Sequence, residues 1–410
     1  MESHEWLHKK ILRNLNKIED WFSQKQKGSF FPFYSSFDLR DAFYKVAPVD
    51  ANLFPAGFNN ICSTDKESAV ELASNYLSQY PSCKKILLLT EEHTKNLYYW
   101  DNVGAIYDIL TASGITVYLS WPQNLDKTFV VKSASGRSFQ VEPFELRGAE
   151  IYVQGERIDL VVSNNDFSEK VDFWFQEIST PINPPISFGW FQRKKNIFFE
   201  KYNCLAEEFC QLLDIDPWHL SIRTSVFENF DIADENSVDR LAEFVENEIK
   251  ILKEQQRNNS DEPFVFIKNI SGTYGLGVLQ AFSGEEVKNW NYKAKKKMKA
   301  SKGGKQIRHL IIQEGIPSAL KTDVNEVAEP VLYLIGKELA GGFLRAHKKK
   351  GPTENLNSPG AVYKKLCLSD LKVNVEGLPM ENIYGWVSRL GVLALSLEIS
   401  SFPKSCISEF

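Results

Sequence analysis

The sequence lacks a surplus of positive charge. Its 410 residues include 48 lysines and arginines against 53 aspartates and glutamates, which gives a formal net charge of −5. Proteins dedicated to nucleic acids or anionic membranes usually carry a basic excess. The composition therefore argues against both classes of partner, and we expect neither nucleic acid nor membrane to be bound.

Zinc-binding motifs are also missing. The six cysteines form no C-x-x-C pair and are Cys62, Cys83, Cys204, Cys210, Cys367 and Cys406. The six histidines are equally scattered, and H-E-x-x-H does not occur. These observations exclude the common zinc motifs. We therefore expect scattered reduced thiols in a cytoplasmic protein.

No secretory signal and no apolar run of transmembrane length is found. The segment MESHEWLHKKILRNLNKIEDWF at 1–22 spaces its apolar residues near the period of a helix, but charges interrupt it throughout. A signal peptide needs an uninterrupted apolar region. The pattern predicts an amphipathic helix packed on the body of the protein, with attachment to a membrane as the alternative.

Residues suited to a packed interior are plentiful. Apolar residues make up 43% of the chain and charged residues 25%, and there are 28 phenylalanines. This balance is typical of a globular protein. A chain of this length exceeds one ordinary core, so we expect two or three domains.

Short apolar runs alternate with helical patterns in the first half of the chain. Helices are predicted at 66–80 and 101–113, and strands at 85–90 (KILLLT), 116–121 (TVYLSW) and 159–166 (DLVVSNND). Continuous apolar runs are typical of buried parallel strands, and ligands bind beyond the carboxyl ends of such strands. The polar sequences TEEHTKN and SNND, which end two of these strands, therefore indicate a candidate polar site.

The strongest local motif combines a lysine on a strand with a glycine-rich loop. Val265–Lys268 is predicted to be a strand, and SGTYGLGV follows at 271–278. Glycines let backbone N–H groups approach phosphate oxygens, and a lysine supplies positive charge for the same phosphates. The Walker signature is missing, and the glycine order does not fit a dinucleotide-binding fingerprint. The motif predicts a phosphate site, with a plain glycine-rich hairpin as the alternative.

Two later segments carry polar groups suited to a nucleotide. The strand LIIQE ends in Gln313 and Glu314, which can offer partners to an adenine and a ribose. Arg345 in GGFLRAH precedes ENLNSPG at 354–360, whose carboxylate and amides suit a phosphoryl group and its Mg²⁺. The alternatives are a strand that runs into a turn and a polar surface loop.

A run of lysines lies between these motifs. Its members are Lys293, Lys295, Lys296, Lys297, Lys299, Lys302 and Lys305. The run admits three interpretations, which are a solvated helix face, a mobile cationic lid over a nucleotide, and a nucleic-acid patch. The third needs aromatic residues for stacking or a basic domain around it, and the negative total charge disfavours it.

Taken in order, these motifs resemble the ATP-grasp superfamily and, more narrowly, the proteobacterial glutamate–cysteine ligases built on that fold. The matching segments begin with PFYSSFDLRDAFYKVAPVDANLFPAGFNN, LLTEEHTKN, VVSNND and GWFQRKK. They continue with FIKNISGTYGLGV, IIQEG, AEPVLYLI and GGFLRAH…ENLNSPG. The resemblance covers nearly the whole chain, and the long N-terminal segment is its specific part.

The resemblance implies an α/β (α+β) protein with an ATP-grasp fold and an N-terminal α/β substrate-binding region. It implies an N-terminal helix and substrate-binding segment at 1–80, an α/β domain at 81–190 that precedes the ATP-grasp part, and an ATP-binding and catalytic domain at 191–410. The implied activity is cytoplasmic, ADP-forming ligation of L-glutamate to L-cysteine through γ-glutamyl phosphate, with ATP and Mg²⁺, as the first step of glutathione biosynthesis. Whether the chain forms a homo-oligomer stays open.

The resemblance also assigns the residues that handle ATP and metal. The catalytic residues would be Lys268, Arg345 and Asn355. ATP would contact Lys268, Gly272, Thr273, Gly275, Gly277, Gln313, Glu314, Lys321 and Asp323. The metal candidates are Glu329, Glu354 and Asn357. Beyond residue 360, the acidic-residue–spacer–Asn pattern of many ATP-grasp enzymes has no clear match.

Amino-acid recognition is expected mainly in the N-terminal part. Arginine and lysine can pair with substrate carboxylates, while aspartate and asparagine can accept from or orient an ammonium group. The candidates are Asp38, Arg40, Lys45, Asp50, Asn59, Asn60, Glu92, His93, Asn164, Asn165, Asp166, Arg193 and Lys194. A local ion pair of Asp38 with Arg40, and a turn cap at Asp50, are the alternative interpretations.

Two other functions are compatible with the same motifs. A ligase for a different acid and amine, such as the glycine-adding step of glutathione synthesis, would share the ATP residues and differ in the N-terminal site. A non-catalytic nucleotide-binding regulator would keep only the fold. Loss of Lys268, Arg345 or the glycines would favour the regulator, and all of these are present.

Overall fold

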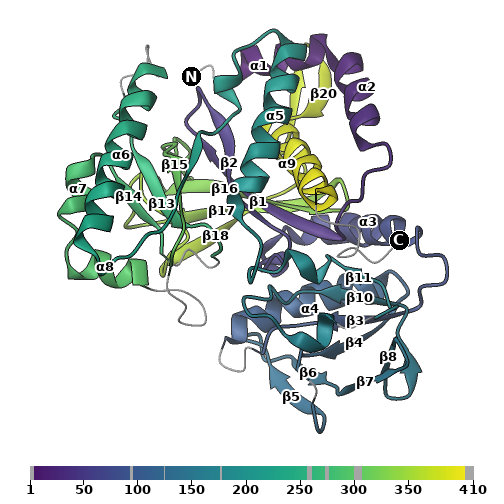
Figure 1. Cartoon of the computed structure of the whole chain (residues 1–410). Coiled ribbons are helices and arrows are strands. Elements are labelled where there is room, and N and C mark those ends of the chain that lie inside the picture. The colour runs from purple at the N-terminus through teal and green to yellow at the C-terminus, as the bar shows by residue number, and fades with distance from the viewer. Residues whose placement is uncertain are drawn as a thin grey trace.

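The computed structural model describes residues 4–92, 96–123, 125–175, 178–255, 261–272, 277–299 and 307–401. Helices and strands are mixed along the chain, and the strands form several separate sheets (Figure 1). This confirms the predicted mixed α and β class. Within the described ranges, no helix combines the length and apolar character that crossing a membrane requires.

A five-stranded antiparallel sheet lies at the centre of the molecule (Figure 1). Its order is β18-β17-β16-β1-β2, with bounds Ala361–Leu366, Glu338–His347, Val327–Ile335, Tyr34–Asp41 and Val46–Asn52. The N-terminal hairpin joins the C-terminal strands through β1 and β16, where Asp38 lies opposite Val331. The pairing therefore brings the N-terminal strand that carries Asp38 and Arg40 close to the strands that carry Glu329 and Arg345.

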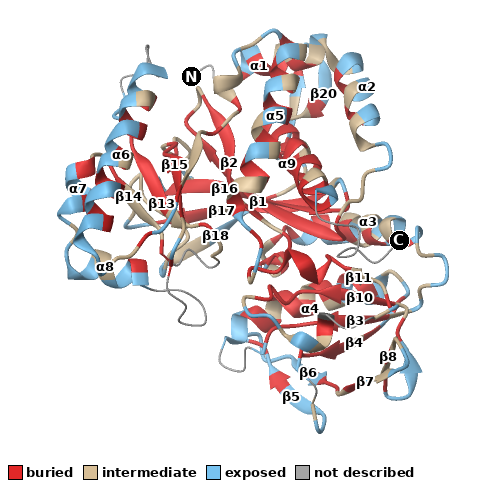
Figure 2. Ribbon diagram, in the orientation of Figure 1, coloured by how far each residue is buried: buried red, intermediate tan, exposed pale blue. Residues whose placement is uncertain are grey.

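The inner strands of the central sheet, β1, β16 and β17, are almost wholly buried, whereas the edge strand β18 is largely exposed (Figure 2). Side chains alternate along a strand, and Leu332 and Leu334 of β16 belong to the core under α5 (Lys195–Leu213) and α9 (Ile383–Ser400). Val331 and Tyr333 belong to the core on the side of α3 (Lys66–Leu77). Two apolar layers thus fix the register of the strands that carry polar residues.

The N-terminal segment forms two helices where one amphipathic helix was predicted. These are α1 (Glu5–Arg13) and α2 (Leu15–Gln26). The break falls at Asn14, whose side-chain amide donates to the Lys10 carbonyl and whose backbone leaves the helical region. The apolar faces of both helices are buried in the central core. Packing on the body of the protein, as predicted, is therefore observed.

A four-stranded parallel sheet forms a separate layer. Its order is β11-β10-β3-β4, with bounds Ile182–Asn183, Leu160–Ser163, Lys85–Leu89 and Thr116–Ser120. Helix α4 (Leu97–Ala112) connects β3 to β4. All three strands predicted in this region are confirmed, and both predicted helices are present with slightly different ends.

A third sheet, antiparallel and four-stranded, lies on the other side of the molecule (Figure 1). Its order is β12-β15-β13-β14, with bounds Thr224–Phe227, Leu310–Glu314, Val265–Asn269 and Leu279–Ala281. Helix α6 (Glu235–Gln255) packs on one face through an apolar stripe. The predicted strands that carry Lys268 and Gln313 are confirmed, and the structure shows that they pair with each other.

Smaller elements complete the fold. The remaining helices are η1 (Phe58–Asn60), η2 (Ser63–Asp65), η3 (Asp172–Phe175), η4 (Ile186–Phe188), η5 (Pro217–His219), α7 (Gly284–Lys288) and α8 (Tyr292–Lys299). The remaining strands are β5 (Phe129–Lys132), β6 (Ser138–Val141), β7 (Phe144–Arg147), β8 (Glu150–Val153), β9 (Glu156–Arg157), β19 (Lys372–Val375) and β20 (Leu378–Glu381).

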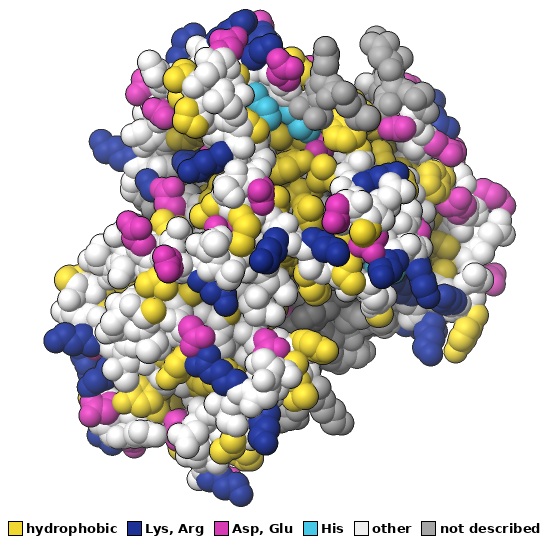
Figure 3. Space-filling model, turned by 180° about the vertical axis from the view of Figure 1, so that it is seen from behind, with side chains coloured by type: hydrophobic (Ala, Val, Ile, Leu, Met, Phe, Trp, Pro, Cys, Tyr) yellow, Lys and Arg dark blue, Asp and Glu magenta, His cyan; other side chains and the backbone are white. Residues whose placement is uncertain are grey.

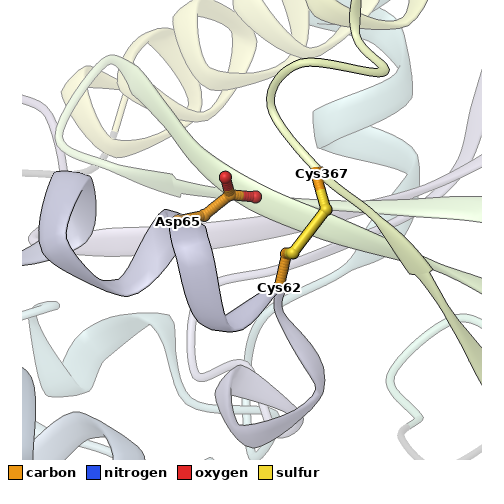
Figure 4. Close-up of side chains that lie close together, drawn as sticks. All are labelled: Cys62, Asp65 and Cys367. Atoms are coloured by element: carbon orange, nitrogen blue, oxygen red, sulfur yellow. A yellow bond between two sulfur atoms is a disulfide. The ribbon is translucent and has the colours of Figure 1, made fainter.

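A disulfide joins Cys62 to Cys367 across 305 residues of sequence, with the two Cα atoms 5.3 Å apart (Figure 4). This corrects the expectation that all the thiols are reduced. Spacing could not reveal the pair, because η1 and β18 bring these residues together only in the fold. The Asp65 carboxylate lies beside the disulfide and accepts from the Leu368 N–H at 2.9 Å. Cys83, Cys204 and Cys210 are free, and Cys406 lies outside the described residues.

Candidate active site

A pocket between the central sheet and the third sheet brings together residues from four strands, the start of α5 and loops far apart in sequence. Its lining is Asp38, Arg40, Val49, Asp50, Lys195, Phe266, Lys268, Asn269, Gly272, Val278, Glu329, Asn355 and Asn357. The members predicted from sequence are Asp38, Arg40, Asp50, Lys268, Gly272, Glu329, Asn355 and Asn357. One cavity thus contains predicted substrate, phosphate and metal residues.

Lys268 projects from β13 into this pocket. Its Nζ donates to the Val49 carbonyl at 3.0 Å and to Gln313 Oε1 at 2.5 Å. Burial lowers the pKa of Lys268 to about 8, although Asp50 opposes that shift. Gln313 is fully buried, and its Nε2 has no hydrogen-bond partner among the described residues. Lysine and glutamine together present a cation and an unused amide donor on one face of the sheet.

Lys195 is a pocket residue that the sequence analysis missed. It is the first residue of α5, and its Nζ lies 2.5 Å from Asp50 Oδ1. Its backbone N–H donates to the Ile270 carbonyl, which fixes the start of the helix against the glycine-rich segment. The sequence analysis had selected Arg193 and Lys194 from the same motif. Three consecutive basic residues gave no signal for which one would face the pocket.

Those two neighbours point elsewhere. Arg193 is buried and forms a two-pronged ion pair with Glu398 of α9, in which its Nε and Nη2 lie 2.9 Å from the two carboxylate oxygens. Lys194 is exposed. Arg193 therefore joins α5 to α9, and neither residue is among those that line the pocket.

Four charged side chains form a buried network, and all of them except the predicted catalytic Arg345 line the pocket. Arg345 Nη1 lies 2.6 Å from Asp38 Oδ2 and 2.8 Å from Glu329 Oε1. Arg40 Nε lies 2.6 Å from Glu329 Oε2. Burial disfavours the charge on Arg345, but Asp38 and Glu329 outweigh that effect and raise its pKa. Buried charges are stable only when paired in this way, so the network fixes the orientation of all four side chains.

The loop after β17 supplies the asparagines of the site. Asn355 Oδ1 accepts from the Asn357 N–H at 3.0 Å, and both residues line the pocket. Glu354, a predicted metal ligand, turns instead to Lys350 Nζ and to the Gly351 N–H, at 2.7 and 2.8 Å. Burial would raise the pKa of Glu354, but Lys350 and Gly351 lower it. The asparagines, and not this carboxylate, therefore face the pocket.

Lys45 and Glu314 pair with each other at a neighbouring cavity. Lys45 Nζ donates to Glu314 Oε1 at 2.6 Å, and Glu314 Oε2 accepts from the Arg223 N–H at 3.0 Å. Glu314 and Gln313 are adjacent on β15, so their side chains point to opposite faces of the sheet. The predicted substrate lysine and the predicted nucleotide glutamate thus join the β1–β2 turn to β15.

The candidates at the carboxyl ends of the parallel strands lie together, but outside the pocket lining. Asn164 donates to the Tyr34 hydroxyl at 3.1 Å and to the Pro55 carbonyl at 3.0 Å, so it holds the parallel sheet to the N-terminal segment. Asn165 donates to the Thr90 carbonyl, and the Asp166 carboxylate accepts from the Ser168 side chain. Asn164 therefore joins two parts of the fold, whereas the cited bonds of Asn165 and Asp166 are made within the part that holds the parallel sheet.

The other predicted residues are dispersed. Asn59 and Asn60 are half-buried in η1, and Glu92, Lys321 and Asp323 are exposed. Gly277 has a positive φ of 64°, a conformation that suits glycine. Thr273, Gly275 and His93 lie outside the described residues.

The described part of the lysine run lies on α8 and is mainly exposed. Met298 is the buried residue of this helix. Partial desolvation of the Lys297 ammonium and the nearby charges of Lys350 and Lys293 lower the pKa of Lys297. Seen from behind, lysine and arginine side chains gather toward the edge of the molecule that carries α8 (Figure 3). The geometry favours the interpretation as a solvated helix face, close to the loop that carries Glu354.

Comparisons with known proteins agree with one another. A sequence model of the glutamate–cysteine ligase family matches residues 8–399. The crystal structure of a provisionally assigned gamma-glutamylcysteine synthetase from Methylobacillus flagellatus KT has a TM-score of 0.85 at 30% identity, and the match covers 97% of this chain and 96% of that one. D-alanyl-alanine synthetase A from Vibrio cholerae O1 biovar eltor str. N16961 gives a TM-score of 0.36 at 12% identity over 78% and 81%, which is too distant to bear on the fold. No curated protein matches the sequence.

Proposed function

Because the chain belongs to the glutamate–cysteine ligase family, we propose that it joins the γ-carboxylate of L-glutamate to the amine of L-cysteine with ATP. The products are γ-glutamylcysteine, ADP and phosphate, and the reaction is the first step of glutathione biosynthesis. The observation that carries the proposal is the pocket in which Lys268 and Lys195 meet Asn355 and Asn357.

The chemistry explains why such a pocket is needed. A carboxylate is a poor electrophile, so it must first become an acyl phosphate. The enzyme must therefore hold a carboxylate and a triphosphate close together, and both are anions. Lys268 and Lys195 supply cations at this point, and fixed charges of this kind stabilise developing negative charge in a water-poor site.

An ATP-grasp mode of nucleotide binding fits the arrangement. The pocket lies between two antiparallel sheets, with Lys268 and Gly272 on the side of the third sheet. We assign the phosphates to these two residues and to the glycine-rich loop, including Thr273, Gly275 and Gly277. The unused Gln313 Nε2 suits an acceptor atom of the adenine. Glu314, Lys321 and Asp323 stay weaker candidates for the rest of the nucleotide.

Mg²⁺ fits the oxygen donors on the opposite wall. Mg²⁺ prefers oxygen ligands and is held by one or two carboxylates together with phosphates and waters. Asn355 and Asn357 offer such oxygens in the pocket. Glu329 also lines it, with its two oxygens shared with Arg345 and Arg40, whereas Glu354 is turned toward Lys350. When bound, Mg²⁺ would neutralise phosphate charge and polarise the transferred group.

Ligation takes place in two chemical steps. An oxygen of the glutamate γ-carboxylate attacks the γ-phosphorus of ATP, and the bond from that phosphorus to ADP breaks. The neutral amine of cysteine then attacks the acyl carbon. Phosphate leaves with the carboxylate oxygen that attacked phosphorus in the first step, and one proton passes from nitrogen to solvent. We assign Lys268 to the charge that develops in these steps and Asn355 to the phosphoryl oxygens. Arg345 does not line the pocket and would act through its contacts with Asp38 and Glu329.

The test is ADP release from Mg–ATP with different substrate pairs. We expect release with glutamate plus cysteine, and none above background with either amino acid alone. Release only with γ-glutamylcysteine plus glycine would keep the ligase and change the step. Binding of ATP without turnover for every pair would favour a non-catalytic regulator.

A further inference from the structure

The guanidinium group of Arg40 is engaged on each side by the protein itself. Besides the contact of its Nε with Glu329, Nη1 donates to the Pro352 carbonyl at 2.9 Å and Nη2 donates to the Glu354 carbonyl at 2.7 Å. The Phe266 ring covers one face, with its centroid 5.9 Å from Arg40 Cζ. A substrate carboxylate would need the two-nitrogen edge that these carbonyls already occupy.

The two carbonyls belong to the segment that leads directly into Asn355. Pro352 O also accepts from the Ser318 N–H, so the start of the segment has a second support. Glu354 O immediately precedes Asn355, whose side chain in turn accepts from the Asn357 N–H. The direction of both asparagine side chains therefore depends on where Arg40 holds the backbone.

The other end of Arg40 connects this loop to the centre of the sheet. Glu329 uses one carboxylate oxygen for Arg40 and the other for Arg345, and Arg345 also contacts Asp38. All four side chains are nearly solvent-free. Removing one member leaves an uncompensated buried charge, so the network resists rearrangement.

We propose that Arg40 is a positioning residue, which holds the Asn355–Asn357 segment in place for Mg–ATP rather than binding a substrate carboxylate. The inference rests on the proposed function in one respect, the assignment of Mg–ATP to this pocket. Groups that orient a metal ligand typically change metal affinity or activity by about 10–100-fold when they are replaced. Arg40 is expected to act in that range through the loop.

The experiment compares Arg40→Met and Arg40→Lys with wild type by calorimetric titration of ATP, once with Mg²⁺ and once with EDTA. For Arg40→Met we expect about a tenfold or larger loss of affinity for Mg–ATP, with affinity for metal-free ATP within about twofold. Arg40→Lys keeps the charge but can satisfy fewer carbonyls, so we expect an intermediate loss. Arg389→Met is the matched control, since it removes an ion pair with Glu381 outside the pocket.

Kinetics separate positioning from direct substrate contact. The KM values for glutamate and cysteine in Arg40→Lys should stay within about threefold of wild type, while kcat and the Mg²⁺ requirement change. A selective rise in an amino-acid KM with unchanged Mg–ATP binding would overturn the inference. So would wild-type behaviour of both variants, or equal losses with Mg²⁺ and with EDTA.

The titrations distinguish failure of the positioning role of Arg40 from failure of the proposed ligase activity. The titrations need no turnover, so they test Arg40 even if wild type releases no ADP with glutamate and cysteine. If Arg40→Met melts well below the control, Arg40→Lys decides the matter alone. Thermal unfolding of all variants is recorded alongside to identify such a loss.

Discussion

Lys268 Nζ donates to Gln313 Oε1 across two neighbouring strands, at a distance of 2.5 Å. The contact places the fully buried Gln313 amide beside the cation of Lys268, which lines the pocket. It also leaves the Gln313 Nε2 donor unused. We infer that the pair suits a ligand that is anionic at one end and accepts hydrogen bonds at the other.

Replacing Lys268 by methionine should abolish turnover and leave the fold intact. The change removes a buried ammonium whose burial already disfavours its charge, so little stability should be lost. The loss of one fixed charge at a phosphate is expected to lower kcat by at least about 100-fold. Steady-state ADP release and thermal unfolding measure the two effects, and Lys268→Arg is the charge-retaining comparison. Full activity in Lys268→Met would remove the phosphate assignment.

The pKa of Lys268, about 8, predicts a pH dependence of ATP binding. The ammonium is protonated below this value and loses its charge as the pH rises through it. The dissociation constant for ATP without amino acids should therefore be flat below pH 8 and rise above it, approaching about tenfold per pH unit. Calorimetric titration between pH 6.5 and pH 9.5 would show the break. Lys268→Arg should remove it, and a break that persists in that variant would assign it to another group.

Replacing Lys195 should reduce catalytic efficiency, whereas replacing Lys194 should not. Lys195 pairs with Asp50 inside the pocket, whereas Lys194 is exposed beside it. Lys195→Met should reduce kcat/KM by about 10–100-fold, since it removes a cation from the anion site and leaves Asp50 less compensated. Lys194→Met is the control from the same motif and should stay within about twofold of wild type. Equal effects of the two substitutions would place Lys195 outside the chemistry.

The Cys62–Cys367 disulfide predicts a difference in stability between oxidised and reduced protein. It closes a loop of 305 residues, and a native disulfide typically contributes about 2–5 kcal/mol to the free energy of unfolding. Denaturant unfolding with and without a thiol reductant should show this loss. Cys62→Ser should show it without reductant, whereas Cys204→Ser, at an exposed free cysteine, should not. Identical midpoints for wild type and Cys62→Ser would contradict the expectation.

The sequence predicted the strands and the pocket residues where a local pattern carries the chemistry. Lys268 precedes a glycine-rich segment, and Asn355 and Asn357 lie in a polar loop after the strand that carries Arg345. Such motifs are short and continuous, so they can be identified without the fold. The mixed class was implied by the resemblance to the ATP-grasp ligases, and the continuous apolar runs predicted individual strands.

Long-range pairing could not be predicted. Glu314 was assigned to the nucleotide, yet it pairs with Lys45, because a strand reverses its face at every residue and only the sheet shows which face is which. Asn164 was assigned to substrate, yet its amide joins two parts of the fold. The roles of Arg40 and Lys195, and the disulfide, depend on contacts between residues more than 100 positions apart.

Isotope transfer tests the central claim most directly. Glutamate labelled with oxygen-18 in its γ-carboxylate is incubated with wild-type enzyme, Mg–ATP and cysteine. The phosphate that is released is then analysed by mass spectrometry. The account predicts one labelled oxygen in each phosphate, because the carboxylate oxygen that attacks phosphorus leaves with it when the amine displaces phosphate. Formation of γ-glutamylcysteine with unlabelled phosphate would contradict the proposed γ-glutamyl phosphate.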